Sequence, residues 1–329
     1  MQNNLFTLSR YFPKGTQYFY GYPAEEDSHF FNAVPPEVEE IVAARALACA
    51  GANIKVICFA STIKPNTWKI LHDELHMLPV EKNQIMRLSE KITAVMKGNE
   101  RNREITEELA RIVSRKKLIM AQPYLDIKMK GLYQIPPQRV VWLNDKRNMF
   151  SFIPKEYLPD RYAEFLDGLC FVETSEKLPL PCVVKVSSSS SGDGVRICRT
   201  KKDLENAKHE FKNVEGMIVV DQYISVKKNL GVQFGIPYDP EKQMDFIGCH
   251  EQITDEGGKF LGGILNPKEY KPYIRKLRSL LLKKILPEVR KKGWYGVGGF
   301  DVLISKDGKF YFVDANFRMT GMTIYDCLV

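Results

Sequence analysis

The chain has 329 residues and a mass of 37.8 kDa, with 48 lysine and arginine residues against 40 acidic ones, so its formal net charge is +8. Apolar residues make up 44% and charged residues 27% of the sequence, as in ordinary globular proteins, which excludes disordered, collagen-like and disulfide-scaffold classes. This length predicts two or three lobes, and the sequence lacks the run of eighteen uncharged apolar residues that a transmembrane helix needs.

Cysteine and histidine residues give no sign of a disulfide framework or a zinc site. The seven cysteines are widely spaced without a Cys-x-x-Cys pair, and the N-terminus lacks the basic and apolar segments of a signal peptide. We therefore expect reduced thiols in a cytoplasmic protein. His72 and His76 are one helical turn apart, but Asp73 stands where the zincin motif requires glutamate, which favours a solvated helix.

The first part of the chain has the pattern of a small open parallel sheet. Residues 16–22 predict a strand, residues 37–50 a helix that two prolines open, and residues 54–60 a second strand. A strand, a helix and a strand at this spacing form a βαβ unit. The elements expected next are charged helices at 81–97 and 100–117 and an apolar strand at 117–121.

The next segment carries lysines beside a turn of small residues. An apolar strand at 140–143 leads to Lys146, and a hairpin at 181–197 carries Lys185 before a turn of serines and glycines. Backbone N–H groups of small residues can converge on an anion, and the lysine supplies positive charge. The lysine precedes the loop, so this is not a P-loop. Taken alone, the stretch fits a flexible surface hairpin and a nucleotide site about equally well.

Two further elements follow along the chain. Residues 217–224 predict an apolar strand that ends in a polar hinge, whose backbone could meet an adenine edge. Residues 268–292 contain ten basic and two acidic side chains, which account for the whole net charge, with apolar residues at helical spacing between them. We expect an amphipathic helix with a solvated outer face; attraction of an anionic substrate, a carrier protein or a membrane surface is the alternative. No nucleic-acid module is indicated.

The last hairpin, at 298–318, presents oxygen ligands. An Asp-Gly turn joins two apolar strands, and antiparallel pairing can place Asp301 beside Asp314. Asn316 follows two residues after Asp314, on the same face, and Arg318 two residues further. Two carboxylates and an amide oxygen suit hard Mg²⁺ ions, whose other ligands are water and phosphate.

The order of these motifs resembles the ATP-grasp superfamily over roughly residues 140–326. The Leu-Asn-Asp-Lys segment and the final Asn-x-Arg-x-Thr-Gly are similar to its peptide-ligase and acyl-carrier-ligase branches. The resemblance implies an α/β protein with the ATP-grasp fold, two α+β subdomains that grip ATP, preceded by a small open parallel βαβ domain. The implied units are a pre-ATP-grasp domain with a helical insert at 1–139 and ATP-grasp subdomains at 140–220 and 221–329.

The resemblance also implies a role for each motif. The residues that would bind ATP are Lys146, Lys185, Ser188, Ser189, Ser190, Ser191, Gly192, Gly194, Asp221, Gln222, Tyr223, Ile224 and Asn229; those that would hold Mg²⁺ are Asp301, Asp314 and Asn316. Arg318 would stabilise the transferring group. The chain departs from the usual pattern in its aspartates at 301 and 314, where glutamate is common, and in its serine-rich loop. Asn229 stands nearest to the place of a ribose-binding glutamate.

The implied activity is ATP-dependent ligation of a carboxylate to an amine or a thiol. The carboxylate attacks the γ-phosphate, ADP leaves, and the amine or thiol attacks the acyl phosphate. The acceptor-side candidates are His250, Glu251, Gln252 and Gly262–Gly263, although a polar strand face without a ligand explains them equally well. The expected partners are small-molecule substrates, an acidic carrier protein and a second copy. The alternatives are an ATP-grasp kinase for a small anionic substrate and a non-catalytic ATP-binding regulatory protein.

Overall fold

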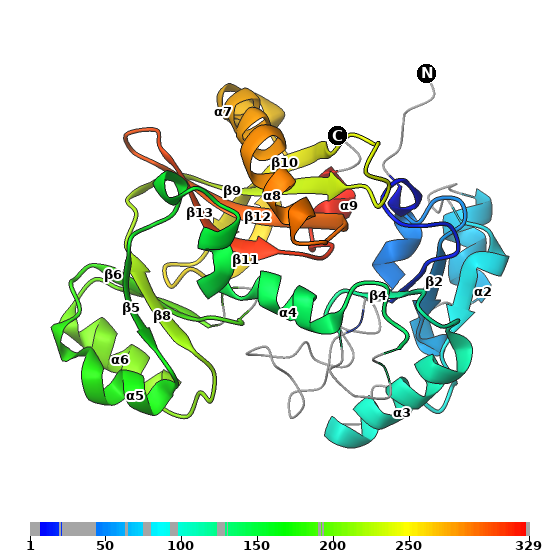
Figure 1. Ribbon diagram of the computed structural model, residues 1–329, viewed down its shortest axis with the longest axis horizontal. Coiled ribbons are helices and arrows are strands. Elements are labelled where there is room, and N and C mark those ends of the chain that lie inside the picture. Colours follow the sequence, from blue (N-terminus) through cyan, green and yellow to red (C-terminus); the bar gives the residue numbers. More distant parts are fainter. Residues whose placement is uncertain are drawn as a thin grey trace.

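The computed structural model describes residues 7–19, 21, 44–62, 65–74, 80–92, 98–123, 129, 131–189, 192 and 194–326. These residues form three sheets, one parallel and two antiparallel, which lie side by side in Figure 1. The mixed α/β architecture predicted from the sequence is confirmed. In the described part of the chain, no helix combines the length and the apolarity that crossing a membrane requires.

The N-terminal sheet is parallel, with strand order β3-β2-β1-β4. Its strands are β1 (Gln17–Phe19), β2 (Lys55–Cys58), β3 (Ile85–Arg87) and β4 (Leu118–Met120). The helices beside it are α2 (Pro65–Trp68), continued by a π-helical turn at Lys69–Glu74, and α3 (Gly98–Ile112), all at the right of Figure 1. The open parallel sheet predicted for this part of the chain is therefore confirmed.

Two helix predictions in this part differ from the structure. The expected helix at 81–97 is wrong in its described residues, which form a 3₁₀ turn (Lys82–Gln84) and then strand β3. Ile85 and Met86 pair with β2, so the edge of the sheet overrides the local helical pattern. Of the expected helix at 37–50, the structure describes the end, a 3₁₀ helix at Ala44–Ala48.

His72 lies in the π-helical turn after α2. Its Nδ1 lies 2.7 Å from Oδ1 of Asp73, and its ring stacks on Trp68 at a centroid distance of 4.4 Å. His76 lies outside the described residues. Because His76 is not described, the solvated helix favoured for this histidine pair stays a prediction.

The small antiparallel sheet has the strand order β5-β8-β6-β7. Its strands are β5 (Arg161–Phe165), β6 (Cys182–Val186), β7 (Val195–Cys198) and β8 (Ile218–Gln222). Helices α5 (Gly168–Thr174) and α6 (Lys201–Phe211) share a hydrophobic core with one face of this sheet. A capping box of Thr200 and Asp203 starts α6.

The strand predicted at 140–143 is wrong, because these residues belong to helix α4 (Pro137–Asn144). Pro137 occupies the first turn, where proline favours a helix start. Val140 and Leu143, three residues apart, are both buried on one side of the helix. Four apolar residues are too few to separate the helical period from the strand period.

The large antiparallel sheet has the strand order β11-β10-β9-β12-β13. Its strands are β9 (Val226–Ile236), β10 (Asp245–Thr254), β11 (Phe260–Ile264), β12 (Gly296–Ser305) and β13 (Phe310–Asn316). The helical segment that covers it consists of α7 (Pro267–Leu280), a π turn (Leu281–Ile285) and α8 (Leu286–Lys291), so the amphipathic helix predicted at 268–292 is present. Helix α9 (Thr323–Asp326) follows β13.

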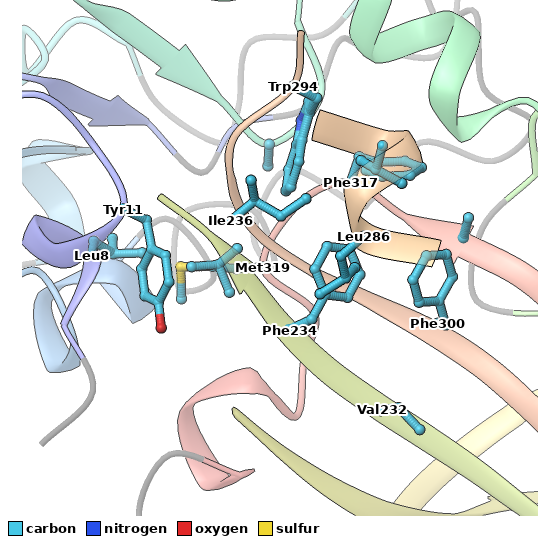
Figure 2. Close-up of a cluster of buried hydrophobic side chains, with 14 of the residues drawn as sticks. Leu8, Tyr11, Val232, Phe234, Ile236, Leu286, Trp294, Phe300, Phe317 and Met319 are labelled. Atoms are coloured by element: carbon cyan, nitrogen blue, oxygen red, sulfur yellow. The ribbon is translucent and has the colours of Figure 1, made fainter. Parts of the chain in front are cut away.

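The main core lies between this helical segment and the large sheet. Figure 2 shows Phe234 and Phe300 stacked beside Leu286, with ring centroids 4.8 Å apart. The same core reaches the N-terminal part of the chain through Leu8 and Tyr11, which lie near Met319 in Figure 2. Because alternate strand residues face this core, the intervening residues form the opposite, open face of the large sheet.

Short 3₁₀ turns complete the described structure. They lie at Leu8–Arg10, Ala60–Thr62, Lys146–Ser151 (η8), Lys155–Tyr157 and Ser175–Lys177.

Candidate functional site

Two carboxylates on neighbouring strands form the centre of the candidate site. Asp301 of β12 lies directly opposite Asp314 of β13, next to a bulge that follows Asp301. Asn316 pairs with Gly299 two positions along the hairpin. Phe300, between these positions, is buried in the core, so the carboxylates and the amide lie on the open face of the sheet.

The carboxyl of Asp301 lies out of water beside a second carboxylate, that of Asp314. Its Oδ1 accepts a hydrogen bond from Nε2 of Gln252 at 2.8 Å. Burial, and after it the charge of Asp314, raises the pKa of the Asp301 carboxyl to about 6, although Gln252, His250 and Lys146 act in the opposite direction. Removal from water, together with the neighbouring Asp314, therefore disfavours the ionised form of Asp301.

His250 is buried on β10 beside this pair. An added Cβ at Gly231 would collide with its imidazole, and one at Gly263 would come within 3.0 Å of its Cδ2. The two glycines, on the neighbouring strands β9 and β11, therefore make room for the ring on the open face. His250, Gln252 and Asp301 form one polar surface of the large sheet.

The donors at this hairpin fit Mg²⁺. The carboxylates of Asp301 and Asp314 and the amide oxygen of Asn316 are hard oxygen ligands, and a dication would favour the ionised form of Asp301, whose pKa burial and Asp314 raise. No cluster of three or more His, Cys, Asp and Glu side chains arranged to hold a metal ion is found among the described residues. Water and phosphate oxygens would supply the remaining ligands of a Mg²⁺ ion held by Asp301, Asp314 and Asn316.

Lys146 reaches this hairpin from the segment between the N-terminal parallel sheet and the first strand of the small antiparallel sheet. It is the first residue of η8, which Asp145 caps by accepting a hydrogen bond from the N–H of Arg147 at 2.9 Å. The Lys146 side chain is 3% exposed; its Nζ lies 3.3 Å from Oδ2 of Asp314 and donates to the carbonyl oxygen of Ser189 at 2.7 Å. The ammonium group therefore links the small-residue loop to the predicted metal ligands.

Lys185 is buried in β6 and also reaches the large sheet. Its Nζ donates to Oδ2 of Asp221 at 2.9 Å and to the carbonyl oxygen of Val313 at 3.4 Å. Arg161 holds the other oxygen of Asp221, with Nε 2.5 Å from Oδ1. Burial by itself would raise the pKa of Asp221, but the charges of Lys185 and Arg161 outweigh it and lower the pKa below its usual value. Asp221 is therefore an ionised bridge between two cations.

The small-residue loop contacts both sheets. Ser189 is buried and donates from Oγ to the carbonyl oxygen of Val186 at 3.0 Å, and Ser188 precedes it. Gly192 has φ of +78°, and an added Cβ there would lie 2.7 Å from the carbonyl oxygen of Gly258, in the β10–β11 turn. The loop and this turn therefore meet, in contacts that only glycine allows. Ser190 and Ser191 lie outside the described residues, and Gly194 is packed against Ser189.

The predicted adenine hinge follows β8. The N–H of Gln222 donates to the carbonyl oxygen of Asp160 at 2.8 Å, so it is engaged within the small sheet. Tyr223 and Ile224 lie outside regular structure; Ile224 is buried, and Tyr223 lies under the guanidinium of Arg199. These residues, unlike Gln222, would have to supply the hinge contacts.

Asn229 lies further along, on the open face of β9 opposite Leu303. Its Oδ1 is buried and has no hydrogen-bond partner among the described residues. A buried acceptor without a donor is costly, so this oxygen is suited to a hydroxyl of a bound ligand.

Arg318 lies where β13 ends. Its Nη1 donates to Oδ1 of Asn316, and the guanidinium borders a small cavity of about 20 Å³ together with Met120 from the end of β4. The preceding N–H, of Phe317, donates to Oδ1 of Asn144 at 3.0 Å. Asn144, two residues before Lys146, therefore ties the lysine segment to the arginine segment.

The structure brings most of the predicted site residues to the junction between the small and the large sheets, which we call the cleft. Hydrogen bonds and an ion pair across this junction link Lys146, Lys185, the carboxylate hairpin and the serine loop. Arg161 and the hydrogen bond between Asn144 and Phe317 were not predicted from the sequence. Asn144 could have been suspected because it precedes the Asp-Lys pair, but a single arginine at the start of a strand gives no signal.

Comparisons with known proteins agree with this geometry. Residues 165–316 match the model of a family described as L-aspartate–L-methionine ligase, ATP grasp. Among solved structures, a biotin carboxylase from Campylobacter jejuni in a β,γ-ATP complex aligns with a TM-score of 0.56 and 16% identity, covering 84% of this chain and 62% of that one. An L-amino acid ligase from Bacillus licheniformis aligns with a TM-score of 0.53 and 14% identity, covering 94% and 70%. At these identities the structures establish a shared fold.

Curated relatives match shorter parts. A formate-dependent phosphoribosylglycinamide formyltransferase from Methanocaldococcus jannaschii is 25% identical over 208 residues, 61% of this chain and 51% of that protein. A D-alanine–D-alanine ligase from Fervidobacterium nodosum is 31% identical over 157 residues, 45% and 46% of the two chains. The chain thus spans about half the length of these curated relatives.

Proposed function

We propose that this chain, which belongs to the ATP-grasp superfamily, is an ADP-forming ligase that joins a carboxylate to an amine. The observation that carries the proposal is the meeting of cations and carboxylates across the cleft. Lys146 reaches Asp314, and Lys185 reaches the backbone of Val313, so both ammonium groups lie at the hairpin that carries the oxygen ligands. This combination suits a polyphosphate with its magnesium ions.

The chemistry needs positioning and fixed charge more than a covalent nucleophile. In the first step an oxygen of the substrate carboxylate bonds to the γ-phosphorus of ATP while the bond to the bridging oxygen of ADP breaks. Lys146 and Lys185 would hold the phosphate oxygens, and Arg318 would hold oxygens of the carboxylate and of the phosphoryl group. Bound Mg²⁺, held by Asp301, Asp314 and Asn316, would neutralise charge on the phosphates.

In the second step the amine nitrogen attacks the carbonyl carbon of the acyl phosphate. The carbon–oxygen bond breaks, inorganic phosphate leaves, and the nitrogen loses a proton. Lys146, Lys185 and His250 are buried, and their burial would limit the access of water to an acyl phosphate bound beside them.

The substrates that we propose are amino acids, with a thiol as a less favoured nucleophile. The matched family model is described by two amino acids, and the ligase from Bacillus licheniformis is an L-amino acid ligase. In this chain, His250, Gln252 and the backbone of Gly262–Gly263 border the same open face and would contact the acceptor. We also propose three domains, one around each sheet, with the limits 1–139, 140–220 and 221–329; β8 of the small sheet extends two residues past the second limit, to Gln222.

A coupled assay tests the proposal. The protein is incubated with ATP, Mg²⁺ and pooled amino acids, and ADP, phosphate and new amide products are measured with and without hydroxylamine, which traps acyl phosphates as hydroxamates. We expect ADP release that depends on a carboxylate, and hydroxamate when hydroxylamine replaces the amine.

Two outcomes would contradict it. ADP release that ignores amines and leaves a stable phosphorylated product would indicate a kinase. ATP binding without turnover across broad pools of carboxylates and amines would indicate a regulatory ATP-binding protein.

A further inference from the structure

Arg161, the first residue of β5, contacts both lysine-bearing segments of the site. Its Nε donates to Oδ1 of Asp221 at 2.5 Å, and its Nη2 donates to the carbonyl oxygen of Lys146 at 3.4 Å. The remaining Nη1 donates to Glu164 at 2.6 Å. One guanidinium therefore joins β5, β8 and the start of η8.

Asp221 bridges Arg161 and Lys185. The sheet register places Asp221 between Arg161 of β5 and Val183 of β6, two residues before Lys185. The side chains of Asp221 and Lys185 are each 7% exposed, and their oxygen and nitrogen lie 2.9 Å apart. Charge-assisted hydrogen bonds away from water hold their geometry more firmly than exposed ones.

The two lysines need such support for a physical reason. A lysine ammonium group sits on a flexible four-carbon stem and has no fixed direction, whereas the planar fork of arginine presents several donors in a rigid arrangement. Arg161 has the geometry to hold two acceptors at once, Asp221 and the backbone of Lys146. With Arg161 and Asp221 in these positions, the ammonium groups of Lys146 and Lys185 lie at the cleft.

We propose that Arg161 is a positioning residue that sets the locations of both phosphate-binding lysines, through Asp221 for Lys185 and through the backbone for Lys146. This inference rests on the proposed function, because the lysines bind phosphate only if the cleft binds ATP. Arg161 itself does not touch the nucleotide in this account. It acts on the phosphate end of the ligand and not on the adenosine end.

Binding of two ligands separates positioning from a general effect on folding. We expect Arg161→Met to weaken MgADP binding by about tenfold or more, which is the size of one lost hydrogen bond to a charged group. Adenosine binding should change by less than about twofold, because adenosine lacks the phosphates that the lysines hold. Both affinities are measured by calorimetry on the full chain, after circular dichroism has established that the variant is folded.

Two further variants sharpen this comparison. Arg161→Lys keeps the charge but offers no fork, so it should bind MgADP with an affinity between those of the wild type and Arg161→Met. Arg196→Met is the matched control, because Arg196 pairs with Glu210 on the edge strand of the same sheet and reaches neither lysine. It should bind MgADP like the wild type.

The proposal is overturned if Arg161→Met binds MgADP like the wild type, or if the affinities for MgADP and for adenosine fall by the same factor. If Arg161→Lys fully restores MgADP binding, a bridging fork is not required and the proposal also fails.

A second measurement does not depend on nucleotide binding. Lysine acylation with acetic anhydride, followed by mass spectrometry, reports how well Lys146 and Lys185 are held, since their side chains are 3% and 7% exposed. In Arg161→Met both should be acylated severalfold faster relative to the exposed Lys306, with no change in Arg196→Met. Unchanged protection would overturn the positioning role. A wild-type protein that protects both lysines through Arg161 yet fails to bind MgADP would instead contradict the proposed function.

Discussion

Lys146 and Asp314 meet across the cleft, with Nζ 3.3 Å from Oδ2, although 168 positions separate them in the chain. One is a predicted phosphate ligand and the other a predicted metal ligand. In this structure each neutralises the other. A nucleotide with its metal ions would replace this ion pair by two stronger ones, in which phosphate meets the lysine and the dication meets the aspartate.

Asp314→Ala should abolish Mg²⁺-dependent turnover, with a fall in kcat of about 100-fold or more, the size seen when a group that stabilises transferred charge is removed. The measurement is ADP release against Mg²⁺ concentration. Asp307→Ala is the control, because Asp307 lies at the exposed turn of the same hairpin. If Asp314→Ala retains unchanged turnover, the metal assignment is wrong.

Asp301 makes metal binding dependent on pH. Burial, followed by the charge of Asp314, raises the pKa of Asp301 from its usual 3.8 to about 6. Mg²⁺ must displace that proton, so the apparent Mg²⁺ affinity should fall as the pH drops below about 6, approaching tenfold per pH unit for one proton. Titrations with Mg²⁺ between pH 5 and 8 would measure this, and a flat affinity across the range would contradict it.

The same shift predicts the stability of Asp301→Asn without metal. A pKa that is higher in the folded than in the unfolded protein means that the folded state favours the protonated carboxyl. The stability that the protonated Asp301 gives the folded protein is fully present below the pKa that Asp301 has in the unfolded chain. It is lost as the pH rises through the folded-state pKa of about 6. Asp301→Asn should therefore raise the thermal midpoint relative to wild type at pH 7.5 and lose this advantage at pH 4. Equal differences at both pH values would argue against the raised pKa.

Gly192→Ala should weaken nucleotide binding. The φ of +78° at Gly192 and the 2.7 Å approach of an added Cβ to the Gly258 carbonyl oxygen make alanine strained there, at a cost of about 1–2 kcal/mol. The loop would shift away from the β10–β11 turn, and the affinity for MgADP, measured by calorimetry, should fall. Gly131→Ala is the control, since an added Cβ there meets nothing within 4 Å. Equal affinities of the two variants would show that the loop contact does not matter.

The basic helical segment should not contribute to catalysis. It covers the face of the large sheet opposite to Asp301, and Lys284 and Lys292 lie over Tyr157 and Trp142 on that outer side. Replacing Lys283, Lys284, Lys291 and Lys292 by glutamine should change the KM for the amino-acid substrate by less than about twofold, because these charges lie on the outer side of the helical segment and salt screens surface charges. A large rise in KM that fades at high salt would instead indicate attraction of an anionic substrate or carrier.

Local patterns along the chain were enough to establish the parallel N-terminal sheet, the hairpin with its opposed Asp301 and Asp314, and the amphipathic helical segment. The hairpin and the helical segment depend on residues close in sequence, so period and turn type predict them, and the parallel sheet was predicted from its βαβ order without its third strand. Val140–Leu143 and residues 81–92 were misassigned, because a proline at a helix start and pairing with a sheet edge decided their conformations.

Tertiary structure alone decided which distant groups meet. Arg161 reaches Asp221 because β5 and β8 pair in one register, and Asn144 of α4 accepts the N–H of Phe317 just after β13. Gln252 of β10 reaches Asp301 of β12 across β9, at the position of Gly231. Such contacts depend on the packing of whole sheets, which no short segment encodes. The sequence motifs indicated which kinds of residue would bind the ligand. The packing of the sheets determined which partners hold each charged group in place.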